Sequence, residues 1–325
     1  MMMLSFVIPV YNCAGYIKKN LDVVYSAGVD ERSFEIVLVD DGSTDESLQI
    51  IREYRKQKEN IIVLSQDNRG ASSARNAGLD CCAGDYVWFV DADDRIEALF
   101  FSKVMALLEC RQYDVICFNH HKEFKEGLID CVEYKARVEV DGTYYYEHRP
   151  SGFIWNKIYK RSFLDNNRFV EGTKNIEDLY FNTKTTLFAN RILLLPEFGY
   201  IYNNTNQNST SSNRSKRNLV KLHQDTMMIH KSINDDIEGI RDALKKKALM
   251  NLLMYSEAGC LFSLLRYYNR RWTFRAIDKY KFLSLYPMKY IGNVKANTFI
   301  FVVNHTIFIE LFYKFVRLKK IIRKK

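Results

Sequence analysis

The chain of 325 residues is long enough for one large domain or two small ones, and its 47% of hydrophobic residues argues against disorder over most of that length. The seven cysteines form no pair of Cys-x-x-Cys motifs, which argues against a zinc site. They are odd in number and scattered along the chain, which indicates a reducing, cytoplasmic compartment. The net charge is +9, and six of the last nine residues are Lys or Arg, which indicates an anionic partner at that end, either a membrane surface or a nucleic acid.

Short apolar segments alternate with amphipathic ones over the first 110 residues. The predicted strands and helices, in chain order, are 4–10, 14–28, 34–40, 45–57, 60–66, 71–83, 85–91 and 96–109, beginning with a strand. No basic segment precedes the first strand, so it is not expected to be a signal peptide. This alternation is typical of a parallel sheet with helices on its faces, and the continuously apolar strands fit burial on both sides.

Unusual polar segments follow all four strands at the point where each ends. They are Tyr11-Asn12, "DDGSTD" (40–45), "QDNRG" (66–70) and "DADD" (91–94). The carboxyl ends of parallel strands share one edge of the sheet, and open α/β sheets bind their ligands outside that edge. The sequence therefore predicts that these four segments meet in one cleft.

The predicted cleft is rich in acids and lacks the usual phosphate-binding loops. No G-x-G-x-x-G follows the first strand, and no G-x-x-x-x-G-K-[ST] occurs anywhere. Carboxylates suit Mg²⁺ or Mn²⁺, which in turn bridge to phosphate oxygens. The alternative is structural: Asp91 to Asp94 form a solvated turn that caps the next helix, "DDGSTD" is a turn with an N-cap, and Tyr11 is an aromatic at the core edge.

Four motifs taken together resemble family 2 glycosyltransferases of the GT-A fold: "FVIPVYN" (6–12), "IVLVDDGSTDES" (36–47), "QDNRGASSARNAGL" (66–79) and "GDYVWFVDADD" (84–94). A looser likeness follows in "WNKIYKRSFL" (155–164) and "NIEDLYFNTK" (175–184). The resemblance implies a Rossmann-like, mostly parallel α/β sheet flanked by helices. Beyond about residue 205 no family motif is found, and the sequence pattern predicts a helical C-terminal region.

The resemblance also implies roles for individual residues. The nucleotide-sugar would be bound by Pro9, Val10, Tyr11, Asp40, Asp41, Arg75, Asp91 and Ala92. Whether Asp40 or Asp41 makes the main contact with the nucleotide stays open. Asp93 would ligate Mn²⁺ or Mg²⁺, and Trp155 and Glu177 would shape the acceptor side.

Asp178 would be the general base for the acceptor hydroxyl. An ordinary aspartate, with a pKa of about 3.9, would be ionised at neutral pH without special tuning. The alternative for "IEDLYF" is a helix start whose acids lie favourably near the helix N-terminus.

The expected function is inverting transfer of a sugar from a nucleotide-diphospho-sugar, a UDP-sugar by resemblance, to a hydroxyl of a glycan or lipid-linked acceptor in cell-surface polysaccharide biosynthesis. A metal-dependent nucleotidyltransferase acting on a sugar phosphate is the alternative. Such an enzyme would usually carry a Gly-rich, basic loop after the first strand, where this chain reads "VYNCAGYI". The acid-rich cleft argues against a nucleic-acid partner.

The expected domains are a GT-A domain over 1–205, with a nucleotide-binding half (1–110) and an acceptor half (111–205), a linker or lid over 206–218, and a helical region over 219–325. The segment 298–325 is apolar and then basic, with Asn304, His305, Glu310 and Lys314 interrupting its apolar run. It predicts an interfacial amphipathic helix on anionic lipid, at the inner face of the cytoplasmic membrane. The alternative is a helix packed on the body, with a solvated basic tail.

Overall fold

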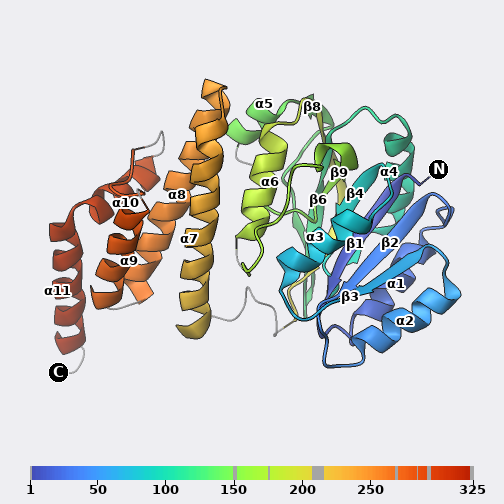
Figure 1. The fold of residues 1–325 in the computed structure, drawn as a ribbon, viewed down its shortest axis with the longest axis horizontal. Coiled ribbons are helices and arrows are strands. Elements are labelled where there is room, and N and C mark those ends of the chain that lie inside the picture. The colour runs from blue at the N-terminus through green and yellow to red at the C-terminus, as the bar shows by residue number, and fades with distance from the viewer. Residues whose placement is uncertain are drawn as a thin grey trace. The chain divides into compact units, whose positions relative to one another are not determined.

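The computed structural model describes residues 2–148, 152–174, 176–206, 216–267, 270–283, 285–290 and 294–322. The chain forms two compact units, Met1–Leu219 and Val220–Lys325 (Figure 1). Of the predicted linker or lid at 206–218, residues 207–215 lie outside the described residues, so that assignment and the division into functional halves stay predictions.

The predicted alternation of strands and helices is confirmed in the first unit. Its elements up to residue 109 are β1 Leu4–Val10, α1 Ile17–Ser26, β2 Phe34–Asp40, α2 Ser47–Gln57, β3 Ile61–Ser65, α3 Ala71–Cys81, β4 Tyr86–Phe89, β5 Arg95–Ile96 and α4 Ala98–Glu109. The short β5 occupies the predicted start of the fourth helix, because Arg95 and Ile96 pair antiparallel with Ile201 and Tyr200 of a later strand.

The rest of this unit adds strands that run in both directions, a 3₁₀ helix and two α-helices. Its elements are β6 Val115–Phe124, β7 Gly127–Cys131, β8 Val138–Val140, α5 Gly142–Glu147, β9 Lys157–Lys160, the 3₁₀ helix η1 Arg161–Phe163, α6 Glu177–Leu187 and β10 Ile192–Asn203. All ten strands form one sheet, with the order β3-β2-β1-β4-β9-β6-β10-β5 and with β7 and β8 attached to β6 and β10.

The pairs β3–β2, β2–β1, β1–β4 and β6–β10 are parallel, so the carboxyl ends of β1, β2, β3 and β4 share one edge. The mixed, mostly parallel α/β architecture that the sequence predicts is confirmed.

Both faces of the sheet are covered, which explains the continuous hydrophobicity of its central strands. Phe6 and Ile8 of β1 point to one face, where they join α1, α2 and α4 in one hydrophobic cluster. Val7 points to the opposite face, where it joins residues of α3 and α6. Gly78 lets α3 lie directly on the sheet there, because a Cβ atom at that position would come within 2.4 Å of Val7 Cγ1.

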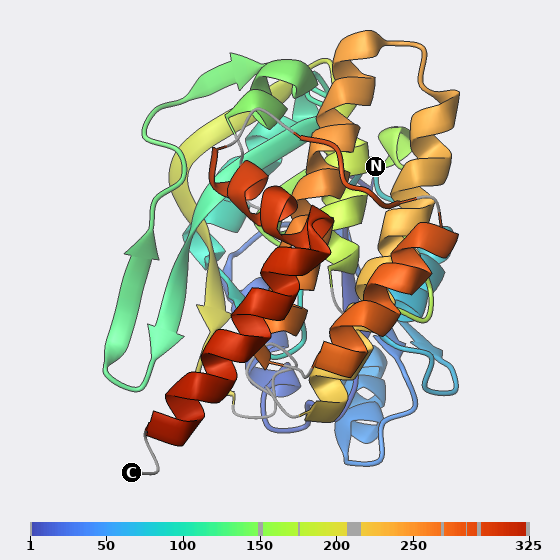
Figure 2. The same ribbon diagram turned by 90° about the vertical axis from the view of Figure 1, so that its left-hand side faces the viewer.

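The second unit is helical in its described part. It contains most of α7 Lys216–Gly239, then α8 Ala243–Tyr267, α9 Arg270–Phe282, α10 Val294–Asn304 and α11 Thr306–Ile322. Figure 2 looks onto α10 and α11, which meet at an angle between Asn304 and Thr306. No helix in the described residues combines the length and the apolar character that crossing a membrane requires.

Candidate active site

The loops after β1 and β2 are tied together by hydrogen bonds from the "DDGSTD" segment. Asn12 adopts a left-handed backbone (φ 51°), and its side-chain Oδ1 accepts a hydrogen bond of 2.8 Å from the Thr44 amide. Its own amide donates to Ser43 Oγ over 3.1 Å. Asp45 accepts from the amides of Ala14 and Ser47. The segment thus holds the loop that carries Tyr11 in addition to forming a turn.

Asp41 anchors the loop that enters α3. Its Oδ1 accepts from Gln66 Nε2 (2.7 Å) and the Arg69 amide (2.8 Å), and its Oδ2 accepts from the Gly70 amide (2.8 Å). Asp40, equally buried, accepts two longer bonds of 3.3 Å from the Ser43 amide and Ser65 Oγ. Both oxygens of Asp41 are therefore engaged in the fold, while those of Asp40 are less strongly bound.

Among the uncharged residues predicted to bind the nucleotide-sugar, Tyr11 is the most accessible, with 47% of its surface exposed. Pro9 is half-buried beside it. Val10 is fully buried in the core, and its carbonyl accepts from the Asp41 amide. Ala92 is also buried, and its carbonyl accepts from the side chain of Asn20. Tyr11 is therefore the side chain among these four that is free to stack on a ligand.

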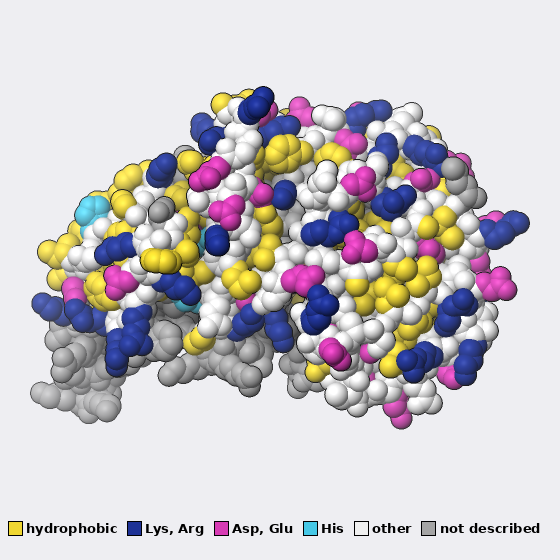
Figure 3. Space-filling view, viewed as in Figure 1, with side chains coloured by type: hydrophobic (Ala, Val, Ile, Leu, Met, Phe, Trp, Pro, Cys, Tyr) yellow, Lys and Arg dark blue, Asp and Glu magenta, His cyan; other side chains and the backbone are white. Residues whose placement is uncertain are grey.

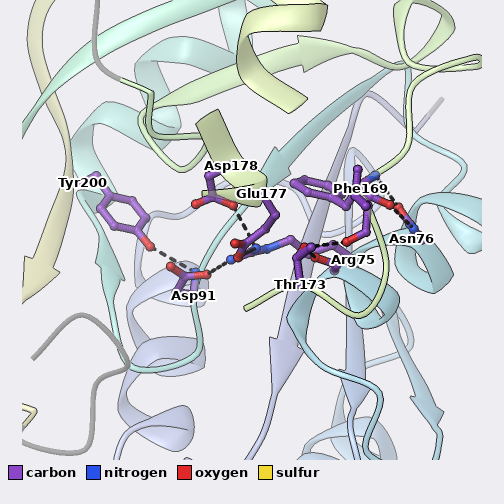
Figure 4. Close-up of polar contacts among 10 residues, drawn as sticks. Arg75, Asn76, Asp91, Phe169, Thr173, Glu177, Asp178 and Tyr200 are labelled. Carbon is purple, nitrogen blue, oxygen red and sulfur yellow. Dashed lines mark hydrogen bonds and ion pairs between the residues drawn. The ribbon is translucent and has the colours of Figure 1, made fainter. Parts of the chain in front are cut away.

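Arg75 lies at the centre of the site and joins three acids from two other segments (Figure 4). From α3, its Nη2 donates to Asp91 Oδ1 over 2.8 Å, and its Nη1 donates to Asp178 Oδ1 over 3.0 Å and to Glu177 Oε1 over 3.4 Å. The side chain is 4% exposed. The structure shows Arg75 as a buried bridge between the end of β4 and the start of α6, and its predicted position near the nucleotide stays a prediction.

The ring of Phe169 packs against the guanidinium group of this bridge. The Arg75 guanidinium carbon lies 5.4 Å from the centroid of its ring, and the ring stacks on Phe181 of α6 at 4.0 Å. Asn76, beside Arg75 on α3, exchanges two hydrogen bonds with the backbone of Phe169. The guanidinium is therefore fixed by packing as well as by its ion pairs.

Asp178 lies in the first turn of α6, and its environment changes its chemistry. Burial raises its pKa to about 7, with Glu177 and Asp91 adding to the shift and with Arg75 and Lys157 opposing it. The expectation of an ordinary pKa is therefore wrong. A carboxyl group whose pKa is near neutrality suits a general base at physiological pH.

The residue before this pair, Ile176, has a left-handed backbone (φ 56°). That conformation is strained for a β-branched side chain, and such strain concentrates at functional sites. Ile176 is the N-cap of α6, so its backbone sets the direction in which Glu177 and Asp178 leave the loop.

The three acids after β4 have separate surroundings. Asp91 pairs with Arg75. Asp94 is buried and accepts from Tyr200 Oη (2.9 Å) and from the Asn203 amide (2.7 Å), both on β10. The predicted helix-capping role of Asp94 is not formed, because α4 begins after Glu97 and no side chain caps it.

Asp93 is the acid of the three that best fits a cation. Burial and the nearby Asp91 raise its pKa, and its Oδ2 accepts from Asn206 Nδ2 over 2.8 Å. Within the described part of the chain, neither Asp93 nor Asp94 forms an ion pair, and no group of three acids, histidines or cysteines is arranged as a metal cage. Crowded carboxylates without a cage fit Mg²⁺ or Mn²⁺, which take one or two carboxylates and complete their shell with phosphate and water.

Trp155 is buried, and its predicted part in shaping the acceptor side stays a prediction. Its ring stacks on Tyr200 (4.6 Å between centroids) and on Phe153 (4.5 Å), and Phe153 is partly exposed. Because the Tyr200 hydroxyl accepts from the Asp91 amide and donates to Asp94, Trp155 acts on the site through Tyr200.

Sequence reasoning missed Tyr200, Phe169 and Lys157. Lys157 is fully buried, donates to Asn156 Oδ1 over 2.8 Å and lowers the pKa of Asp178. The "WNK" motif contains Lys157, so a signal for it was present; Tyr200 and Phe169 lie in segments with no distinguishing pattern.

Comparison with known proteins places the chain in a family. The model of glycosyl transferase family 2 matches residues 5–170, and the chain belongs to this family. Similar proteins include glycosyltransferase GlyA of Streptococcus pneumoniae, 32% identical over 212 residues that cover 61% of this chain and 30% of GlyA. The uncharacterized glycosyltransferase EpsJ of Bacillus subtilis is 30% identical over 210 residues, covering 62% of this chain and 60% of EpsJ.

A third relative is the poly(ribitol-phosphate) beta-N-acetylglucosaminyltransferase TarS of Staphylococcus aureus, 31% identical over 208 residues that cover 62% of this chain and 35% of TarS. The chain thus spans less than two thirds of the length of these three relatives. A crystal structure of TarS residues 1–349 with UDP-GlcNAc superimposes with a TM-score of 0.67 at 23% identity, covering 94% of this chain and 90% of the other. That similarity confirms the GT-A fold.

Proposed function

We propose that the protein is an inverting glycosyltransferase that moves a sugar from a nucleotide-diphospho-sugar to an acceptor hydroxyl, with Asp178 as general base. The observation that carries the proposal is the bridge of Arg75 to both Asp91 and Asp178. It joins the acid at the donor edge of the sheet to a carboxyl group whose pKa is near 7. Membership of glycosyl transferase family 2 favours sugar transfer over the alternative, nucleotidyl transfer.

In the proposed reaction, the ionised Asp178 accepts the proton of the acceptor hydroxyl as that oxygen attacks C1 of the sugar. The bond from C1 to the diphosphate oxygen breaks on the opposite face, so the configuration at C1 inverts. The ion pair with Arg75 holds the carboxylate of Asp178 in place for this proton transfer. Tyr11 stacks on the base of the nucleotide, and Asp91 faces its ribose.

A Mn²⁺ or Mg²⁺ ion held by Asp93 would neutralise the charge that develops on the diphosphate leaving group. The donor is a UDP-sugar by analogy with TarS, whose solved complex contains UDP-GlcNAc. The acceptor is a hydroxyl of a glycan or lipid-linked molecule in cell-surface polysaccharide synthesis; the name of TarS gives a polymer, poly(ribitol-phosphate), as the acceptor of that relative. A lipid-linked acceptor would place the enzyme at the cytoplasmic face of a membrane.

Thermal unfolding of the full chain with UDP, GDP or dTDP, each with Mn²⁺ or with EDTA, tests the donor site. A ligand that binds only the folded state raises the unfolding temperature. We expect the largest rise with UDP and Mn²⁺, and loss of that rise in Asp93→Ala. Release of UDP from a panel of UDP-sugars then identifies the sugar. Stabilisation by none of the nucleotides would contradict the proposal.

A further inference from the structure

Four large apolar side chains are exposed where α10 meets α11. Phe301 on α10 is 42% exposed, and Ile307, Phe308 and Leu311 on α11 are 65%, 39% and 52% exposed. Positions 307, 308 and 311 lie on one side of a helix, and the ring of Phe301 lies 5.2 Å from that of Phe308. These four residues form one patch, which we call the elbow face.

The outward direction of the elbow face is fixed by contacts on the opposite side of the same helices. Ile300, Val303 and Ile309 are fully buried there. On α11, Glu310 forms an ion pair with Arg270 of α9, and the Tyr313 hydroxyl is 2.7 Å from Thr273 Oγ1.

The turn itself is also anchored. Asn304 exchanges two hydrogen bonds with the backbone of Met288, and the Tyr286 hydroxyl donates to the carbonyls of Val303 and Asn304. The exposure therefore belongs to a firmly held surface rather than to a loose helix, and a contiguous apolar patch on such a surface marks a site of interaction.

The charge of this unit indicates what covers the patch. Residues 220–325 contain 21 Lys and Arg against 8 Asp and Glu, whereas residues 1–219 contain 27 against 31. Lys314, one helical turn after Leu311, is exposed. The chain continues with Arg317, Lys319, Lys320 and a final Arg-Lys-Lys, whose side chains lie outside the described residues. In Figure 3, dark-blue and yellow side chains lie close together over the described part of the helical unit, at the left of the view.

We propose that the elbow face docks on an anionic lipid bilayer, with its four apolar side chains at the boundary of the acyl chains and the basic residues at the headgroups. An apolar face followed by a cluster of cations is the pattern of interfacial helices. Its surplus of positive charge favours lipid over a second copy of the same unit, because two copies would repel each other. The inference does not depend on the transferase assignment.

Co-sedimentation of the full chain with vesicles tests the proposal. We expect binding to vesicles of phosphatidylcholine with 30% phosphatidylglycerol, weak binding to pure phosphatidylcholine, and a loss of binding as salt screens the headgroups. The double variant Ile307→Asp/Leu311→Asp should lower the partition coefficient at least tenfold. Its matched control is Leu244→Asp, an equally exposed leucine (62%) on α8, which should bind like the parent.

Unchanged release of UDP from the donor, or an unchanged circular dichroism spectrum, shows that the double variant is folded. A second variant, Lys314→Gln/Lys319→Gln/Lys320→Gln, keeps the apolar face and should weaken binding to anionic vesicles only. Equal binding by the double variant and the parent would overturn the proposal. The proposal would also be overturned if the parent protein bound neither kind of vesicle. If that parent formed a dimer that Ile307→Asp/Leu311→Asp disrupts, a second copy of the chain, and not lipid, would cover the elbow face.

Discussion

The Arg75 cluster of the sheet unit and the Glu257 site of the helical unit bury ionisable groups in different ways. In the sheet unit, Arg75 meets three acids, and Asp41 accepts three hydrogen bonds. In the helical unit, the fully buried Glu257 of α8 has no hydrogen-bond partner among the described residues, and His230 of α7 lies 3.7 Å from it. Paired groups position one another, whereas burial without a partner favours the neutral form of an acid.

The difference separates the proposed catalytic site from a core that tolerates polar groups. Burial raises the pKa of Glu257 to about 9 and lowers that of His230 to about 3, so both are neutral at pH 7. Perturbed groups are often taken as signs of a functional site. Here the pKa of Glu257 is shifted further than that of Asp178, yet Glu257 lies in the core of the helical unit, away from the proposed catalytic residues.

Asp178→Asn should have the largest effect, because it removes the base while keeping the shape of the side chain. We expect transfer to fall about 10³-fold with unchanged affinity for the donor. In the parent, kcat/KM should rise about tenfold per pH unit up to the pKa near 7 and then level off, because only the ionised form accepts a proton. Steady-state kinetics from pH 5 to 9 measure the loss of transfer in the variant and the pH dependence of kcat/KM in the parent. The control is Asp165→Asn, a change at an exposed aspartate. A variant that retains most of its turnover would refute the base assignment.

Arg75→Lys should have the next largest effect. A lysine keeps the charge but cannot reach Asp91 and Asp178 with two separate nitrogens, so Asp178 loses its fixed position. We expect kcat to fall about 100-fold, in line with the cost of misplacing a reacting group, and the KM for the donor to change little. The control is Arg69→Lys, which alters the exposed ion pair with Glu171. If KM rises and kcat holds, Arg75 contacts the nucleotide instead.

Tyr11→Ala should lower the affinity for UDP about tenfold, as the loss of one base–aromatic stack does elsewhere. Tyr11→Phe keeps the ring and should bind like the parent. Calorimetric titration with UDP compares the two. Equal affinities for the Ala and Phe variants would show that Tyr11 is only an exposed aromatic at the core edge.

Glu257→Gln should have the smallest effect and should be confined to the helical unit. Folded Glu257 stays protonated up to about pH 9 whereas the unfolded residue ionises near 4.3, so its stabilisation is complete below about 4.3 and is lost as pH rises toward 9. His230 acts in the opposite sense between about pH 3 and 6.5. The net loss of stability, about 1.4 kcal/mol per pH unit, therefore falls between about pH 6.5 and 9.

Hydrogen exchange of the α7–α9 amides at pH 6.5 and 8.5, corrected for intrinsic rates, measures that loss. Near Glu257 the buried titratable neighbours are His223 and His230 on α7, Cys260 on α8 and Tyr280 on α9. Glu257→Gln should remove the pH dependence, and the exposed Glu238→Gln should keep it. If the helical unit of the parent protein were equally stable at pH 6.5 and pH 8.5, the folded protein would tolerate the ionised form of Glu257, and the prediction would be wrong.

Much of the sheet unit follows from its sequence because its signals are local. Apolar segments of four to seven residues form the parallel strands β1 to β4, and the polar residues that follow them meet because parallel strands share one edge. The resemblance pointed to Asp91, Glu177 and Asp178, which the structure brings together around Arg75.

The sequence does not show which carboxylates form their hydrogen bonds within the protein and which are left to bind a ligand. Asp41 and Asp94 carry the same side chain as Asp93, yet their oxygens are taken up by neighbours far away in the chain. The role of Trp155 likewise depends on Tyr200, 45 positions later. The shifted pKa of Asp178 arises from burial, which no local pattern encodes.

The left-handed backbone of Ile176 has a consequence for engineering the protein. Glycine adopts this conformation freely, so a search for heat-resistant variants should select Ile176→Gly, which relieves strain of about 1–3 kcal/mol. The same change would free the segment that aims Glu177 and Asp178, and activity would decline as resistance to heat improved. At this position, thermal stability and catalytic activity therefore depend in opposite ways on the same backbone torsion.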